Sequence, residues 1–330
     1  MSAADARPAT DITDQAHDAG GVTVRLPFRA PFDGDGLLAF LAARAVRGVE
    51  EATPGGYRRS LALPGGTGVM ELAARADHVQ ATFWLEDERD LGPAIDGCRR
   101  LLDLDADPAG VVRHLRSNPV VGDLVRAVPG RRVPGHSDGG ELAIRAVLGQ
   151  QVSVAAATTL AAALVARLGE PLSRPVGAVT HLFPTPASLA ALDPDALPMP
   201  RSRARTVIAV ADGLSRGTLR LDDGAERTAS IAALRAVPGI GPWTAGYVAM
   251  RALHDPDAFV PGDSGIRHAL ELLGRDPGLA ATARLAERWR PYRAYATVHL
   301  WSYVSQAPRR TMAARHGNMH GRAIRCGRVR

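Results

Sequence analysis

The chain has 330 residues, of which 46% are hydrophobic and 22% charged, and its formal net charge at neutral pH is +6. This composition is typical of a soluble globular protein with two or three domains, and because no run of about 18 apolar residues occurs, we expect no membrane span. The only cysteines, Cys98 and Cys326, exclude a multi-cysteine zinc site or an iron–sulfur cluster.

The net charge does not by itself point to nucleic acid. Seven arginines and no acidic residue lie in residues 309–330, and without this tail the chain would carry 33 basic residues against 34 acidic ones. Such a basic tail holds phosphates weakly or serves solubility, and its composition does not decide between the two. All 40 basic residues are arginine, so no lysine amine exists to form a Schiff base.

The first part of the chain mixes strand and helix patterns. Residues 1–20 contain four aspartates and no apolar run, which predicts a disordered leader. An alternating segment then predicts a strand, and "GDGLLAFLAARAV" has helical spacing. Three short strands and a helix should follow, over 57–63, 68–75, 79–85 and 91–104. Consecutive short strands favour an antiparallel sheet with helices on one face.

Past residue 108 the strand signals fade and helical periodicity dominates. Glycine, proline and aspartate separate the expected helices, which cover 141–149, 154–169, 186–192, 203–217, 230–237, 243–253, 265–274, 283–289 and 291–304. Pro291 is suited to the first turn of the last of these helices.

One corner between two helices is rich in glycine: "VPGIGPW", residues 237–243. Gly239 and Gly241 allow positive φ and a close approach of another backbone, and Pro242 suits the first position of the next helix. The exposed N–H groups of Trp243 and Thr244, with the helix dipole, would form an anion site. Spacing alone does not separate this interpretation from a plain tight corner.

Three further features lie near this corner in the sequence. Asp263 is placed as the N-cap of a helix, where the dipole favours its charged form; the alternative is a plain cap. Trp243 and Tyr247 are neighbours at i and i+4 on one helix face, for which core packing is the alternative. Gln150 and Gln151 occupy a turn between two apolar helices, which is also compatible with a solvated turn.

Four segments in order resemble the helix-hairpin-helix DNA glycosylase superfamily, and within it the bacterial DNA-3-methyladenine glycosylase II type. They are "VRLPFRAPFDGDGLLAFLAARAVRGVE", "AIRAVLGQQVSVAAATTLAAALVARLGEPL", "LRAVPGIGPWTAGYVAMRALHDPDAFVPGDSGIRHAL" and "RWRPYRAYATVHLW". The resemblance implies an α+β fold, in which an antiparallel sheet with helices precedes a mostly α-helical core of two lobes. We expect an N-terminal α/β domain over 21–112, the helical core over 113–308 with the hairpin at 230–252, and a basic tail over 309–330.

The resemblance implies a base-excision enzyme that bends duplex DNA, flips out an alkylated purine and hydrolyses its N-glycosidic bond. Asp263 would stabilise the oxocarbenium-like sugar. Trp243, Tyr247, Trp301 and Gln150 would form the base pocket, where aromatic faces attract a cationic base by about 0.5–2 kcal/mol each. DNA phosphates would bind at Gly239, Gly241 and Thr244, and Gln151 would stand at the wedge position, where the best-known member has leucine.

Three positions depart from the family pattern. Trp243 stands where strand-cutting relatives have lysine, which implies a monofunctional glycosylase. Pro242 replaces a residue that is often basic, and Gly262 replaces one that is often acidic.

The partner is expected to be double-stranded DNA containing alkylated bases, and the protein a cytoplasmic, nucleoid-associated monomer that binds no membrane. No metal and no required cofactor are expected, and a monovalent cation on the hairpin carbonyls is left open. Two alternatives also stay open: the same fold acting on oxidised or deaminated bases, and a non-catalytic helix-hairpin-helix DNA-binding protein. Asp263 separates the last alternative from an enzyme, because a pure binding module does not need it.

Overall fold

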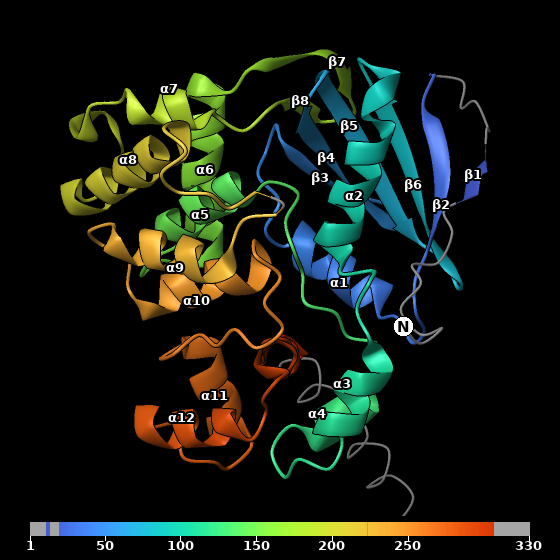
Figure 1. The fold of residues 1–330 in the computed structure, drawn as a ribbon, viewed down its shortest axis with the longest axis vertical. Coiled ribbons are helices and arrows are strands. Elements are labelled where there is room, and N and C mark those ends of the chain that lie inside the picture. The colour runs from blue at the N-terminus through green and yellow to red at the C-terminus, as the bar shows by residue number, and fades with distance from the viewer. Residues whose placement is uncertain (1–10, 14–19, 223, 307–330) are drawn as a thin grey trace, which may run out of the picture.

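A computed structural model describes residues 11–13, 20–222 and 224–306 of the chain. Its first part is a six-stranded antiparallel sheet with the strand order β1-β2-β6-β5-β4-β3. Helices α1 and α2 share a hydrophobic core with the sheet (Figure 1). The elements of this part are β1 (Asp11–Thr13), β2 (Val22–Pro27), α1 (Gly34–Ala42), β3 (Glu50–Thr53), β4 (Gly56–Leu63), β5 (Gly66–Ala74), β6 (His78–Leu85), a 3-10 turn (Glu88–Asp90) and α2 (Leu91–Leu102).

The expected antiparallel sheet is confirmed, with two differences: β3 is not among the expected strands, and the leader contributes a strand. Residues 11–13, expected to be disordered, form β1 and pair with β2. The free backbone groups along the outer side of β2 explain this pairing, because an edge strand can accept a further strand. The rest of the leader and the basic tail 309–330 lie outside the described residues.

The second part is helical and forms two groups of elements beside and below the sheet (Figure 1). The 3-10 turn Pro194–Ala196 and a helix over residues 293–306 belong to it. The other helices are α3 (Pro108–Leu115), α4 (Gly122–Ala127), α5 (Gly139–Leu148), α6 (Val154–Leu168), α7 (Pro186–Ala190), α8 (Arg201–Ser215), α9 (Arg227–Ala236), α10 (Pro242–Arg251), α11 (Ser264–Leu272) and α12 (Leu279–Glu287). No helix in the described part of the chain is long and apolar enough to cross a bilayer.

Two hydrophobic cores confirm the expected lobes of the helical part. One core lies among α5, α6 and α8, and the other among α3, α4, α11 and the helix 293–306. Helix α10 belongs to both, because Ala245 and Val248 face the first core while Ala249 and Met250 face the second. The lobes are therefore joined through one shared helix.

Three expectations about boundaries need correction. The expected domain limit at 112 falls inside α3, whose Val111 packs in a helical core, whereas Leu104 still belongs to the sheet core. Pro291 precedes the last helix, which begins at 293. A hairpin of β7 (Pro171–Val176) and β8 (Val179–His181) interrupts the helical region. Both strands are short, and β7 is mostly exposed and contains two prolines, so the sequence shows no apolar alternation here.

Buried ion pairs join the sheet to the helical part. Arg59 of β4 binds Glu141 of α5 at 2.6 Å, and Arg145 of α5 binds Glu141 at 2.7 Å and Glu50 of β3 at 3.0 Å. Burial alone would raise the pKa of both carboxyls, but the two guanidinium groups outweigh it and hold the pKa of Glu50 and of Glu141 below the usual value. Removing one partner of such a network typically costs about 3–5 kcal/mol.

His136 lies inside this network. Its Nδ1 accepts a hydrogen bond from the Asp138 N–H at 3.1 Å, and its Nε2 lies 3.5 Å from Glu141. Burial, reinforced by Arg59 and Arg145, lowers the pKa of His136 well below 6.5. The imidazole is therefore neutral in the folded protein.

We predict that stability falls as the pH drops from about 7.5 to about 5.5. A histidine that stays neutral when folded but binds a proton when unfolded costs about 1.4 kcal/mol of unfolding free energy per pH unit below its unfolded pKa of about 6.5. His136 acts in this direction, as does His299, whose pKa burial lowers to about 3. Asp103 opposes them below pH 6, because burial raises its pKa to about 6 and it keeps a proton that the unfolded chain loses.

Urea unfolding of the wild type and of His136→Gln at three pH values checks this prediction. The variant should show a pH slope smaller by about one proton. Equal slopes would contradict the assignment of a neutral, buried His136.

Candidate active site

The glycine corner connects α9 to α10 and packs against α8. Gly239 has φ +91°, and a Cβ added there would lie 2.1 Å from Oγ1 of Thr206. The same hydroxyl donates a hydrogen bond to the carbonyl of Pro238 at 2.9 Å. Both the backbone and the neighbouring helix thus require glycine at position 239.

Gly241 differs from Gly239 because nothing inside the protein requires it. Its backbone is extended, with φ −91° and ψ 176°, and an added Cβ would meet no atom within 4 Å. Gly241 is the N-cap of α10 and no side chain caps this end of the helix. The first N–H groups of α10 therefore face open space, which suits an anionic ligand.

Asp263 is the N-cap of α11, and its carboxylate is held by three N–H donors. Oδ1 accepts from the Ile266 backbone at 2.8 Å and from Nε1 of Trp301 at 2.8 Å. Oδ2 accepts from Nε1 of Trp243 at 2.9 Å. With 7% of the residue exposed, the carboxylate has a fixed orientation and only a narrow access to solvent.

The aromatic side chains form one continuous group beside Asp263. Trp243 stacks on Tyr247 with centroids 5.2 Å apart, and Tyr247 lies 6.2 Å from Trp301 at a tilt of 46°. Trp301 in turn stacks on Phe40 of α1 at 6.3 Å. The structure thus brings together the three aromatic residues predicted for a base pocket and adds Phe40 from the sheet domain.

Two arginines border this aromatic group. Arg251 donates to the carbonyls of Pro134 and Gly135 at 2.8 and 2.9 Å and to the Tyr247 hydroxyl at 2.5 Å. The Arg44 guanidinium lies 3.7 Å from the ring centre of Phe40. Burial would raise the pKa of Tyr247, but the two guanidinium groups together outweigh burial and lower it.

Sequence reasoning missed Phe40, Arg44 and Arg251. The available signal was the i, i+4 spacing of Phe40 and Arg44 outside the apolar stripe that Leu37, Leu38 and Leu41 bury. A pair of large side chains off the buried stripe of a helix indicates a second contact surface.

The glutamine turn reaches the hairpin. Gln150 Nε2 donates to the Gly239 carbonyl and to Thr244 Oγ1, both at 3.0 Å. Gln150, expected in the base pocket, is thus engaged as a brace of the hairpin. The Thr244 hydroxyl is engaged by Gln150 and the residue is 3% exposed, so its backbone N–H at the first turn of α10 is the group left as the candidate phosphate donor. Gln151 is exposed at the tip of the turn with φ +57°, a conformation that is unfavourable for a residue other than glycine and often marks a functional position.

A set of possible metal ligands lies away from Asp263. Glu50, His136 and Glu141 place their ligand atoms within 4.8 Å of one another. Both carboxylates already bind Arg59 or Arg145, and guanidinium groups so close repel a metal cation. We assign no metal to this set.

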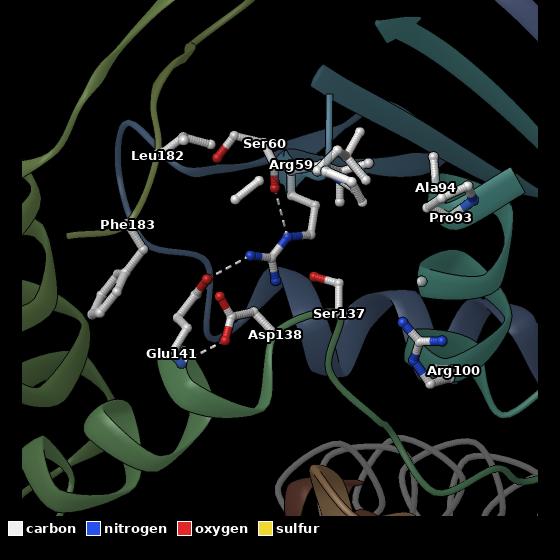
Figure 2. Close-up of a pocket in the computed structure, with 15 residues that line it drawn as sticks. Arg59, Ser60, Pro93, Ala94, Arg100, Ser137, Asp138, Glu141, Leu182 and Phe183 are labelled. Atoms are coloured by element: carbon white, nitrogen blue, oxygen red, sulfur yellow. Dashed lines mark hydrogen bonds and ion pairs between the residues drawn. The ribbon is translucent and has the colours of Figure 1, made fainter. Parts of the chain in front are cut away.

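A pocket of about 240 Å³ lies at the junction of the sheet domain and α5 (Figure 2). The ion pair between Arg59 and Glu141 forms part of its wall, and Ser60, Pro93 and Phe183 line it further. None of the residues predicted for catalysis or DNA binding lines this pocket. The candidate active site is therefore the aromatic group with Asp263.

Two family models match consecutive parts of the chain. Residues 23–138 match the AlkA N-terminal domain, and residues 144–291 match the HhH-GPD superfamily of base excision DNA repair proteins. The helical part with its glycine hairpin therefore identifies the class of the chain, which is that of the base excision DNA repair proteins.

Two curated relatives cover most of the chain. The "Probable bifunctional transcriptional activator/DNA repair enzyme AlkA" of Mycobacterium tuberculosis is 46% identical over 297 residues, covering 90% of this chain, which spans 60% of that relative's length. DNA-3-methyladenine glycosylase 2 of Escherichia coli K12 is 38% identical over 285 residues, covering 84% of this chain and 95% of the relative. The chain therefore belongs to the DNA-3-methyladenine glycosylase II family of the HhH-GPD superfamily.

A solved structure supports the fold. The 3-methyladenine DNA glycosylase of Archaeoglobus fulgidus superimposes with a TM-score of 0.70, covering 84% of this chain and 97% of the other, at 18% identity. At this identity the likeness concerns the fold alone.

The two hairpin glycines should respond differently to alanine. Gly241→Ala should leave the free energy of unfolding nearly unchanged, because its backbone is ordinary and its surroundings are open, but it should weaken binding to abasic-site DNA by about fivefold or more by placing a methyl group before the N–H donors. Gly239→Ala should destabilise the fold by about 1–3 kcal/mol through its positive φ and the overlap with Thr206. Urea unfolding and fluorescence anisotropy measure the two effects. A Gly241→Ala protein with wild-type DNA affinity would contradict this use of the hairpin.

Proposed function

We propose that the protein is a monofunctional DNA glycosylase that hydrolyses the N-glycosidic bond of alkylated purines, of the 3-methyladenine and 7-methylguanine type, flipped out of duplex DNA. The observation that carries the proposal is the fixed carboxylate of Asp263 beside the aromatic group, with both Trp243 and Trp301 bonded to it. A pure DNA-binding module has no use for a carboxylate in this position.

The chemistry requires stabilisation of a positive charge. When the bond between the base and C1′ breaks, its electron pair leaves with the base and the sugar becomes oxocarbenium-like. A pre-oriented carboxylate stabilises that charge without having to reorganise. Water then bonds to C1′ and loses its proton, which balances the hydrolysis. Asp263 is the group we assign to this role.

The aromatic group supports selection of an alkylated base. Purines alkylated at N3 or N7 are cationic and are attracted to the faces of electron-rich rings. Alkylation also weakens the glycosidic bond, so a stacking pocket with few hydrogen bonds suffices. Trp243, Tyr247 and Trp301 are the residues that we assign to this pocket. We place Gln150 beside it, because Gln150 is hydrogen-bonded to Gly239 and Thr244 of the hairpin.

DNA would be held at the backbone of the hairpin. We assign phosphate contacts to the turn at Gly239 and Gly241 and to the N–H of Thr244, which carry no sequence information. Gln151, exposed in a left-handed conformation, is assigned as the wedge that fills the gap left by the flipped base. The protein would act on alkylated duplex DNA as a monomer associated with the nucleoid.

A monovalent cation near the hairpin fits the groups present there. The carbonyls of Pro238 and Gly239 each accept one hydrogen bond from a side chain, which leaves a second lone pair on each oxygen. A cation bound there would add positive charge next to a phosphate, and no chemical step depends on it.

Asp263→Asn should reduce base excision at least about 100-fold, because the charge that stabilises the sugar is lost, while binding to abasic-site DNA is retained. The measurement is the release of free bases from methylated genomic DNA, identified by mass. Asp193→Asn, which alters another N-capping aspartate, is the matched control and should behave like the wild type. Undiminished excision by Asp263→Asn would refute the assignment.

The protein should leave an intact abasic site after excision. Enzymatic strand cleavage by β-elimination uses an amine that forms a Schiff base, and the chain contains no lysine, with Trp243 at the hairpin position. A labelled duplex carrying one lesion should give cut product on a denaturing gel only after treatment with hot alkali. Efficient cutting without alkali would contradict this part of the proposal.

A further inference from the structure

We propose that Arg44 determines which bases the site prefers, by donating hydrogen bonds to the acceptor edge of the flipped base. This contact assists the excision of purines that carry a carbonyl oxygen at position six and gives no such assistance to purines with an amino group there. The inference rests on the proposed glycosylase function and specifies the selectivity of the same site.

Arg44 reaches the site through a short series of contacts. Its guanidinium carbon lies 3.7 Å from the ring centre of Phe40, and the Phe40 ring stacks on Trp301. Trp301 donates to Asp263. Arg44 therefore stands at the edge of the aromatic group that includes the catalytic candidate, although it comes from the sheet domain.

The two arginines at this site differ in how their donors are used. Each of the three guanidinium nitrogens of Arg251 binds an oxygen, of Pro134, Gly135 or Tyr247. Arg44 donates one long hydrogen bond of 3.3 Å to the carbonyl of Phe40 and has the Tyr247 hydroxyl as a second hydrogen-bond partner. Since a guanidinium has five N–H groups, Arg44 keeps donors for a ligand, whereas Arg251 is committed to the fold.

The charge of Arg44 also lacks a counterion. Within residues 11–13, 20–222 and 224–306, no carboxylate forms an ion pair with Arg44. Burial lowers the pKa of Arg44 and the Tyr247 hydroxyl only partly offsets this, yet an arginine remains charged at neutral pH. A half-buried cation with spare donors gains most from an acceptor oxygen.

The backbone of Arg44 is fixed by the domain junction. Its carbonyl accepts a hydrogen bond from Arg145 at 2.7 Å, and Arg145 also binds Glu50 and Glu141. The guanidinium therefore starts from a defined position, which is what discrimination between similar bases requires.

Single-turnover excision from matched duplexes tests the inference, with hypoxanthine as the neutral six-carbonyl base and 3-methyladenine as the cationic six-amino base. Arg44→Met, which keeps the length of the side chain, should lower the hypoxanthine rate about tenfold or more and leave the 3-methyladenine rate within about twofold of wild type or above it. Arg44→Lys should give an intermediate ratio, because it keeps the charge but loses the fork of donors. The exposed Arg47 provides the matched control, Arg47→Met, which should not change the ratio.

Equal loss on both substrates, or an unchanged ratio in Arg44→Met with an unchanged melting temperature, would overturn the role of Arg44. If Arg44→Met melts early, Arg44→Lys decides, and a wild-type ratio in that variant also overturns it. Failure of the proposed function is distinct, since the wild-type protein would then not release 3-methyladenine.

Discussion

The buried ion pairs between the sheet and α5 fix the position of the helical part relative to the sheet. Arg59 and Glu50 come from adjacent strands, and Glu141 and Arg145 come from one face of α5. Each charge has a partner, so the cost of removing the charges from water is offset, and the geometry permits one arrangement of the two domains. Arg145 also binds the carbonyl of Arg44, which extends this constraint from the domain junction to the edge of the active site.

The candidate active site is correspondingly composite. The hairpin and Trp243 come from α9 and α10, and Asp263 is the N-cap of α11. Trp301 comes from the helix 293–306, and Phe40 comes from α1 of the sheet domain. The indole N–H groups of two of these elements meet on one carboxylate. The tryptophans therefore have two tasks, since they fix the catalytic candidate as well as present aromatic faces.

Features encoded locally were predictable from the sequence. The φ of Gly239, Pro242 at the start of α10 and Asp263 as an N-cap each depend on a few adjacent residues. Four strands of the sheet, β2, β4, β5 and β6, were also predictable from local sequence, whereas β1 and β3 were not. Contacts between distant segments were not predictable, such as Gln150 with Thr244 or Trp301 with Asp263. The residues of these two pairs lie 94 and 38 positions apart in the sequence. Hydrophobic periodicity describes one element at a time and does not indicate which distant side chains will be in contact. The pairing of Asp11–Thr13 with β2 was not predicted for the same reason, because it depends on the free outer edge of β2 and not on the sequence of residues 11–13.

Helix α10 packs in both helical cores, and this has a mechanical consequence. The lobes cannot swing apart like two jaws, because any opening would pull buried side chains of one helix out of one core or the other. The two lobes joined in this way are stiff, and a stiff protein leaves most of the deformation on binding to its ligand. For a duplex docking on the hairpin, the deformation energy would thus be spent in the DNA, and damaged sites, where stacking and pairing are already weak, would deform most readily. Rigidity of the protein would then itself help to distinguish damaged from intact DNA.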